Sequence, residues 1–250
     1  MIILGINETS HDASVSLIKD NYIIFAGHSE RYSKEKNDWY CNDELLQDAL
    51  KYGYPDVIAY YEKPFLKKSR LFLKGGQGDW NPKIPYKLTN IFGKPIPKYY
   101  FKHHYSHAAA GYYTSSFDDA VIVVLDAIGE WNTSTVWVGE GEKISLKFKQ
   151  NYPVSFGLFY SAFTKLLGLK PNQEEYIMMG MSAYGERGFG DLLKHGLVDD
   201  EKDITFKDNL HIGIDPTYLS HISDMDLAAG AQDLCENLVY NVMARAWRLN

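Results

Sequence analysis

A strand pattern that occurs twice constrains the fold of this chain more than any other feature. The first copy predicts strands over Ile2–Asn7, Ala13–Lys19 and Tyr22–His28, and the second over Ala120–Asp126, Thr133–Gly139 and Ile144–Gln150. An offset of 119 residues aligns Asn7 with Asp126 and Ser14 with Thr133. Such self-similarity predicts two copies of one structural unit, with two unrelated β-meanders as the alternative.

Helical segments follow each strand group. A helix over Asn42–Lys51 leads to a buried strand over Asp56–Tyr61, which is expected to lie parallel to the first strand. Further helices are predicted over 104–115, 155–168 and Ala228–Asn250, and an irregular, proline-rich excursion over 62–98. We therefore predict an α/β fold with a first lobe over 1–118 and the start of a second lobe over 119–250.

Composition excludes several classes of protein. The 250 residues carry a formal net charge of −6, whereas a dedicated duplex nucleic-acid binder normally shows a basic footprint. Two distant cysteines, Cys41 and Cys235, exclude a disulfide framework or a zinc finger and fit a reducing compartment. Because no apolar run reaches transmembrane length, we predict a cytoplasmic chain without a membrane partner.

A histidine pair is the strongest local signal for chemistry. His103 and His107 stand four residues apart, so on a helix they share one face and suit two imidazole ligands of one metal ion. His104 occupies the position where a zinc protease would have glutamate. A carboxylate ligand must come from elsewhere, and two surface histidines are the alternative.

Two polar turns occupy equivalent places in the two copies. The first runs from Asn7 to Ser14 and contains His11 and Asp12, a pair suited to acid–base work, although a capped hairpin turn would look the same. The second begins at Asp126, whose carboxylate could bind a metal or accept a proton.

A methionine-rich segment forms the last candidate. Gly180 and Gly185 follow Glu175 in this segment and could allow the backbone to approach a ligand closely. Core packing is the commoner use of such methionines.

Taken together and in order, these segments resemble the NodU/CmcH-type O-carbamoyltransferases. The resemblance rests on Gly5-x-Asn7-x3-His11-Asp12-Ala13-Ser14, Ser29-Glu30-Arg31, His103-His104-x2-His107-Ala108-Ala109, Tyr112-Tyr113-x2-Ser116-Phe117-x2-Ala120, Asp126-x2-Gly129-Glu130-Trp131 and Glu175-Tyr176-x2-Met179-Gly180-x2-Ala183-Tyr184-Gly185. It implies an N-terminal part with two ribonuclease-H-like lobes of the actin/Hsp70/sugar-kinase fold, related to the subunit that transfers threonylcarbamoyl to tRNA. It also implies transfer of a carbamoyl group from carbamoyl-adenylate, made from ATP and carbamoyl phosphate by a YrdC-like domain, to a hydroxyl of a small molecule or glycan.

The resemblance also implies roles for single residues. His103 and His107 would hold a divalent metal, with iron expected, and His11 and Asp126 would be catalytic, Asp126 as the base. The residues expected to bind carbamoyl-adenylate are Asn7, Ser14, Gly129, Glu130, Glu175 and Gly180.

Two departures from the family pattern qualify this reading. Ile177 stands where the family usually has lysine, which predicts the loss of a contact to phosphate or to a carboxylate. Relatives are longer, which predicts that the rest of the second lobe and the YrdC-like domain, in the same or a separate chain, lie outside these residues. The rival hypotheses are a non-catalytic nucleotide-binding or regulatory module of the same fold and an ATP-dependent small-molecule kinase.

Overall fold

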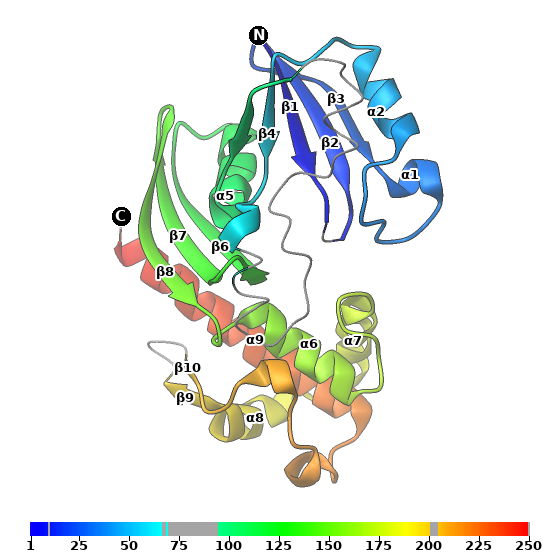
Figure 1. The fold of residues 1–250 in the computed structure, drawn as a ribbon. Helices are drawn as coiled ribbons and strands as arrows, with labels where there is room; N and C mark the ends of the chain where they lie inside the picture. The colour runs from blue at the N-terminus through cyan, green and yellow to red at the C-terminus, as the bar shows by residue number, and fades with distance from the viewer. Residues whose placement is uncertain (10, 67–68, 70–94, 201–204, 250) are drawn as a thin grey trace. The chain divides into compact units, whose positions relative to one another are not determined.

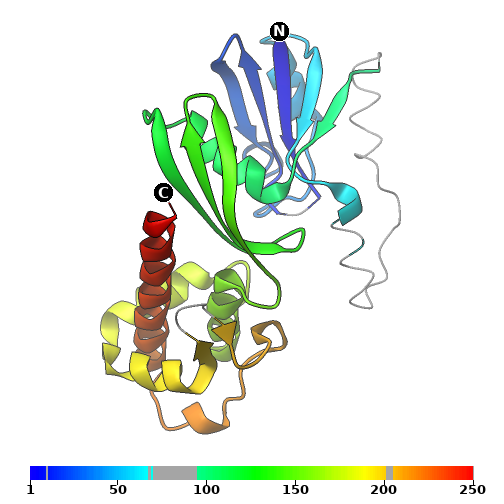
Figure 2. The ribbon, with the colours of Figure 1, turned by 90° about the vertical axis from the view of Figure 1, so that its left-hand side faces the viewer.

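A computed structural model describes residues 1–9, 11–66, 69, 95–200 and 205–249 of the chain (Figure 1 and Figure 2). Its contacts divide the chain into two compact units, Met1–Ser106 and His107–Asn250. The domain boundary that we expect at 118/119 stays a prediction, and most of the excursion over 62–98 lies outside the described residues.

The first unit is built on a five-stranded mixed sheet with strand order β3-β2-β1-β4-β5. Its strands are β1 (Ile2–Asn7), β2 (Ser14–Lys19), β3 (Tyr22–His28), β4 (Val57–Tyr60) and β5 (Lys98–Tyr100). The first three strands are antiparallel neighbours, and β4 pairs with β1 in parallel. Both the predicted meander and the predicted parallel strand are confirmed, as is the α/β class.

Helix α2 (Asp43–Leu50) connects the meander to β4, and its local sequence explains both its start and its packing. The Asn42 side chain accepts a 2.8 Å hydrogen bond from the Leu45 N–H, which satisfies one of the free donors at the helix start. Leu45, Leu46 and Ala49 form the buried face of the helix. Burying each leucine contributes about 2 kcal/mol, which fixes the helix on the sheet.

Helix α5 (His103–Tyr113) crosses the dividing point, and its residues from His107 onward belong to the second unit. An antiparallel sheet follows, with strand order β6-β7-β8, formed by Asp119–Gly129, Asn132–Glu140 and Lys143–Asn151. These strands confirm the second occurrence of the strand pattern.

The first unit also contains a short helix, α1 (Glu30–Ser33), which follows β3.

A helical layer completes the second unit. It contains α6 (Phe156–Leu166), α7 (Glu175–Met181), α8 (Gly190–Leu197) and α9 (Asp224–Arg248), with the small strands β9 (Val198–Asp200) and β10 (Thr205–Phe206). The predicted apolar face of α6 is confirmed, since Phe156, Phe159 and Phe163 are buried in the core of this unit. Helix α9 begins four residues before the predicted Ala228, because Ser223 caps it by accepting the Asp226 N–H. Among the helices that the structure describes, none is both long and apolar enough to cross a bilayer.

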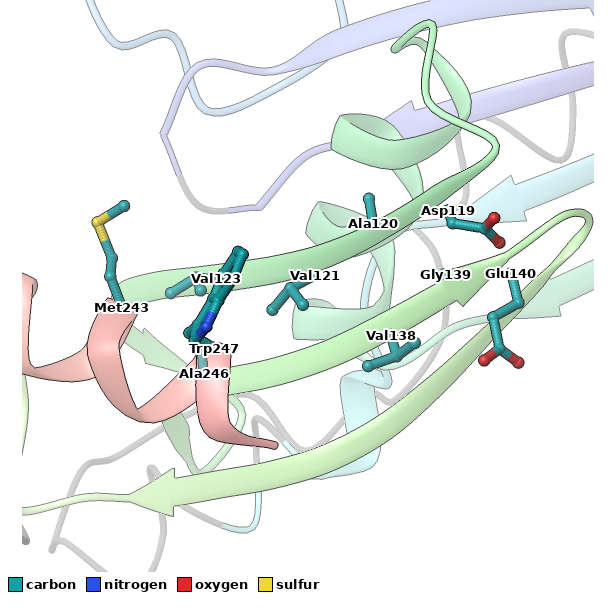
Figure 3. A pocket seen from close by; sticks show the side chains of 10 residues that line it. All are labelled: Asp119, Ala120, Val121, Val123, Val138, Gly139, Glu140, Met243, Ala246 and Trp247. Atoms are coloured by element: carbon teal, nitrogen blue, oxygen red, sulfur yellow. The ribbon is translucent and has the colours of Figure 1, made fainter. Parts of the chain in front are cut away.

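A hollow of about 730 Å³ lies in the second unit, between the sheet and the C-terminal end of α9 (Figure 3). Figure 3 shows Met243 and Trp247 at one end of it and the carboxylates of Asp119 and Glu140 at the other. Its lining comprises Asp119, Ala120, Val121, Val123, Val138, Gly139, Glu140, Met243, Ala246 and Trp247. None of the residues predicted to be functional lines this hollow.

Both cysteines are free thiols whose environments predict low reactivity. Burial, followed by the nearby Glu8 carboxylate, raises the pKa of Cys41 far above the usual range for a thiol. Burial also raises the pKa of Cys235 to about 11. At pH 8, about one Cys235 side chain in a thousand is therefore a thiolate, the form that reacts with iodoacetamide. We expect iodoacetamide at this pH to leave both cysteines unmodified in the folded chain and to modify both after unfolding. Mass spectrometry of timed samples checks this; labelling of Cys41 at the unfolded rate would contradict its buried position.

Candidate metal centre

The predicted histidine pair lies on helix α5, which begins at His103. Figure 1 shows α5 as a continuous helix, and His103 and His107 are one turn apart on it. The Ser106 hydroxyl donates a 2.7 Å hydrogen bond to the Tyr61 carbonyl oxygen, which ties the first turn of α5 to the segment after β4. The helix that the sequence predicts here is therefore confirmed.

Asp126 lies near the end of β6, where the pairing with β7 becomes irregular. The register shifts between Leu125 and Gly129, so the intervening residues leave the regular ladder. One carboxylate oxygen, Oδ1, accepts a 2.7 Å hydrogen bond from the Ala127 N–H, and the Ser155 hydroxyl donates to the Ala127 carbonyl oxygen at 2.7 Å. This bulge is thus fixed by the cap of helix α6, and it presents the Asp126 carboxylate at a defined place.

His103, His107 and Asp126 form one group of potential metal ligands. Each offers one ligand atom, and these atoms all lie within 4.8 Å of one another. His107 and Asp126 belong to the second unit, and His103 precedes His107 by one turn on the same helix. Two imidazoles and one carboxylate are a donor set that first-row divalent metals, including Fe²⁺, accept. The residues therefore fit the predicted ion, and Asp126 is a candidate for the carboxylate ligand that the histidine pair requires.

A second polar cluster lies in the first unit, around the turn from Asn7 to Ser14. Asp12 has a left-handed backbone with φ of 58°, and the Asn7 amide donates a 3.1 Å hydrogen bond to its carbonyl oxygen. The Asp12 carboxylate lies 2.7 Å from His11 Nδ1 and 3.6 Å from His28 Nε2. Asp12 thus holds one nitrogen of His11 and leaves the other available for chemistry. His28 was missed by the sequence reading, although the register places it opposite Ser14.

The remaining predicted residues occupy several separate places. Asn7 and Ser14 are register partners on β1 and β2, so the structure does bring these two together. Glu130 follows Gly129 in the β6–β7 turn, is buried and has a positive φ of 58°. Glu175 on α7 accepts hydrogen bonds from the Ser161 hydroxyl at 2.9 Å and from a backbone N–H, so its carboxylate already has partners within the protein.

The two glycines of the methionine-rich segment differ in their surroundings. Gly180 lies on α7 with open space where a side chain would project. At Gly185, a Cβ atom would fall on the backbone of Met225 and 2.7 Å from the Asp226 nitrogen, at the start of α9. The close backbone approach at Gly185 is therefore an approach to α9.

Two histidines and one carboxylate close together in an α/β chain are typical of many different metal-dependent proteins. Comparison with known families is more specific about which protein family this chain belongs to. The model of the carbamoyltransferase N-terminus matches residues 60–237, which is most of the chain. This chain belongs to the carbamoyltransferase N-terminus family.

Curated relatives agree with this membership. An uncharacterised protein of Synechocystis is 32% identical over 240 residues, covering 83% of this chain and 38% of its own length. The nodulation protein NolNO of Sinorhizobium fredii is 26% identical over 266 residues, covering 95% of this chain and 38% of its own length. The chain therefore spans little more than a third of these relatives. Among solved structures, an Aquifex aeolicus Ppx/GppA enzyme matches 99% of this chain with 11% identity and a TM-score of 0.35.

Proposed function

We propose that this chain is the transferring part of an O-carbamoyltransferase, which binds carbamoyl-adenylate and a divalent transition metal, with iron preferred. The group of His103, His107 and Asp126, within a chain of the carbamoyltransferase family, is the observation that carries the proposal. The acceptor is a hydroxyl of a small molecule or a glycan. Carbamoyl-adenylate comes from ATP and carbamoyl phosphate on a YrdC-like domain outside these residues.

The proposed reaction is a carbonyl transfer that balances without a redox partner. The acceptor oxygen forms a bond to the carbamoyl carbon, the bond between that carbon and the AMP phosphate oxygen breaks, and the hydroxyl proton goes to a base. The products are the O-carbamoylated alcohol, AMP and a proton. When bound, the metal supplies Lewis-acid stabilisation of the charge that develops on oxygen.

Within this reaction, the chain's own residues have separate tasks. His11, oriented through Nδ1 by Asp12, stabilises charge on the carbamoyl group or moves a proton. Asp126 acts as a metal ligand in this proposal, which replaces the role of base that the sequence suggested. The residues proposed to bind the carbamoyl-adenylate are Asn7, Ser14, Gly129, Glu130, Glu175 and Gly180. Glu175 also accepts hydrogen bonds from the Ser161 hydroxyl and the Asn172 N–H, which hold its carboxylate in place.

Titration calorimetry with a non-hydrolysable carbamoyl-adenylate analogue tests this proposal on the chain itself. We expect saturable binding that is at least about tenfold tighter than the binding of AMP, because only the analogue offers the carbamoyl group. The affinity should fall when the metal is removed with a chelator and recover when Fe²⁺ or Co²⁺ is added back.

The competing functions predict other results. A folded, metal-loaded chain that binds neither the analogue nor AMP would overturn the proposal. ADP formation from ATP with an alcohol, without any carbamoyl donor, would indicate a kinase instead. As a matched control, His11→Ala should keep metal binding, because His11 lies outside the group of metal ligands.

A further inference from the structure

Glu62 is a buried carboxylate two residues after strand β4, and no role was predicted for it from the sequence. The residue is 3% exposed. Taking a carboxylate out of water costs several kcal/mol unless partners compensate it, so a glutamate in this position needs groups that hold its charge. The groups in contact with the Glu62 carboxylate therefore indicate its role.

His103 is one charged or polar partner that the structure places beside Glu62. The His103 Nδ1 atom lies 3.8 Å from Glu62 Oε2, and the two side chains are only 16% and 4% exposed. This is an ion-pair distance, and a side-chain adjustment of about 1 Å would make it a hydrogen bond. Nδ1 therefore faces the carboxylate.

The orientation of the His103 ring is fixed from a second side. The Tyr61 ring packs edge-on against it, with centroids 5.3 Å apart and an interplanar angle of 65°. Tyr61 is itself joined to α5 by the hydrogen bond from Ser106 to its carbonyl oxygen. Tyr61, Glu62 and the first turn of α5 thus form one local structure within the first unit.

We propose that Glu62 is a positioning residue for the metal centre: it accepts the Nδ1–H of His103 and so keeps the Nε2 lone pair available to the ion. Histidine ligands usually donate their other ring N–H to a carboxylate or carbonyl, which fixes the tautomer and makes the ligating nitrogen more basic. This inference rests on the metal binding in the proposed function, and it adds a residue outside the three ligands to that site.

The experiment compares Co²⁺ affinity, by competition with a chromophoric chelator, among the wild-type chain and two variants. Glu62→Gln keeps the side-chain volume and removes the charge, and it should weaken binding about 10-fold. Glu62→Met also removes the acceptor, and it should weaken binding about 100-fold. In the metal-free chains, long-range ¹H–¹⁵N spectra should show His103 as the Nδ1–H tautomer in the wild type and as a mixture of tautomers in Glu62→Met.

Asp56→Asn is the matched control, because Asp56 lies at the opposite end of β4 and holds the Ile2 N–H at 2.7 Å. It should leave both the Co²⁺ affinity and the His103 spectrum unchanged. Folded Glu62 variants that bind Co²⁺ like the wild type would overturn the inference and leave the metal centre standing. Failure of the wild-type chain to bind Co²⁺ would overturn both, and it would be visible before any variant is compared.

Discussion

Asp126→Asn should reduce the affinity of the chain for Fe²⁺ or Co²⁺ by at least about 100-fold, or about 2.8 kcal/mol of binding free energy. The substitution keeps the shape of the side chain and its acceptor for the Ala127 N–H, but it removes the only carboxylate among the three grouped ligands. His107→Ala should have an effect at least as large, since it removes a ligand outright. Elemental analysis after dialysis against a fixed metal concentration, followed by chelator competition, measures both.

His195→Ala controls for the loss of a histidine in the second unit, because His195 lies on α8 with Nδ1 2.7 Å from the Asp191 carbonyl oxygen. The His195→Ala chain should bind metal like the wild type.

Comparing metal content with carbamoyl transfer in the Asp126→Asn chain separates the two roles considered for Asp126, metal ligand and general base. An Asp126→Asn chain that keeps its metal but cannot transfer a carbamoyl group would restore the role of general base and remove that of ligand.

The sequence predicted those parts of the fold that local patterns determine. Alternation of apolar residues and short polar turns predicted β1 to β4 and β6 to β8, because each of these signals lies within a few neighbouring residues. The 119-residue offset then related the two groups of three strands to each other. The short strands β5, β9 and β10 carry no such pattern and were not predicted. The HxxxH spacing likewise places His103 and His107 on one helical face without knowledge of the tertiary structure. The start of α9 was missed because it depends on a capping contact of Ser223 rather than on hydrophobic periodicity.

The site was less predictable, because its geometry depends on contacts between distant segments. Nothing local to Glu62 indicates that its carboxylate faces His103, which is 41 residues later in the chain. The pairing of Asp12 with His28 depends on the register of β2 and β3, and that register includes a shift that no sequence pattern showed. The ligand role proposed for Asp126 depends on the bulge at the end of β6. Each of these features is a consequence of tertiary packing.

The backbone contact at Gly185 leads to the largest expected effect on stability. Gly185→Ala should destabilise the chain by about 3 kcal/mol, because the added Cβ would overlap the Met225 backbone and force α9 away from the preceding segment. The strain is steric rather than conformational, since φ at Gly185 is −105°, which alanine adopts readily. Moving α9 away from Gly185 would also weaken the 2.8 Å hydrogen bond that the Glu186 N–H donates to the Asp226 carboxylate. This hydrogen bond lowers the pKa of the Asp226 carboxyl. Urea unfolding followed by circular dichroism measures the change.

Gly180→Ala is the internal control for this effect, because it makes the same chemical change five residues earlier. Gly180 lies on helix α7 with open space around it, so alanine should be neutral or stabilising by up to about 1 kcal/mol through its higher helix propensity. Since Gly180 is also proposed to bind carbamoyl-adenylate, its variant should weaken binding of the analogue while the fold is kept. The opposite order of stabilities, with Gly180→Ala unfolding first, would show that the tight approach to α9 is not what glycine provides at position 185.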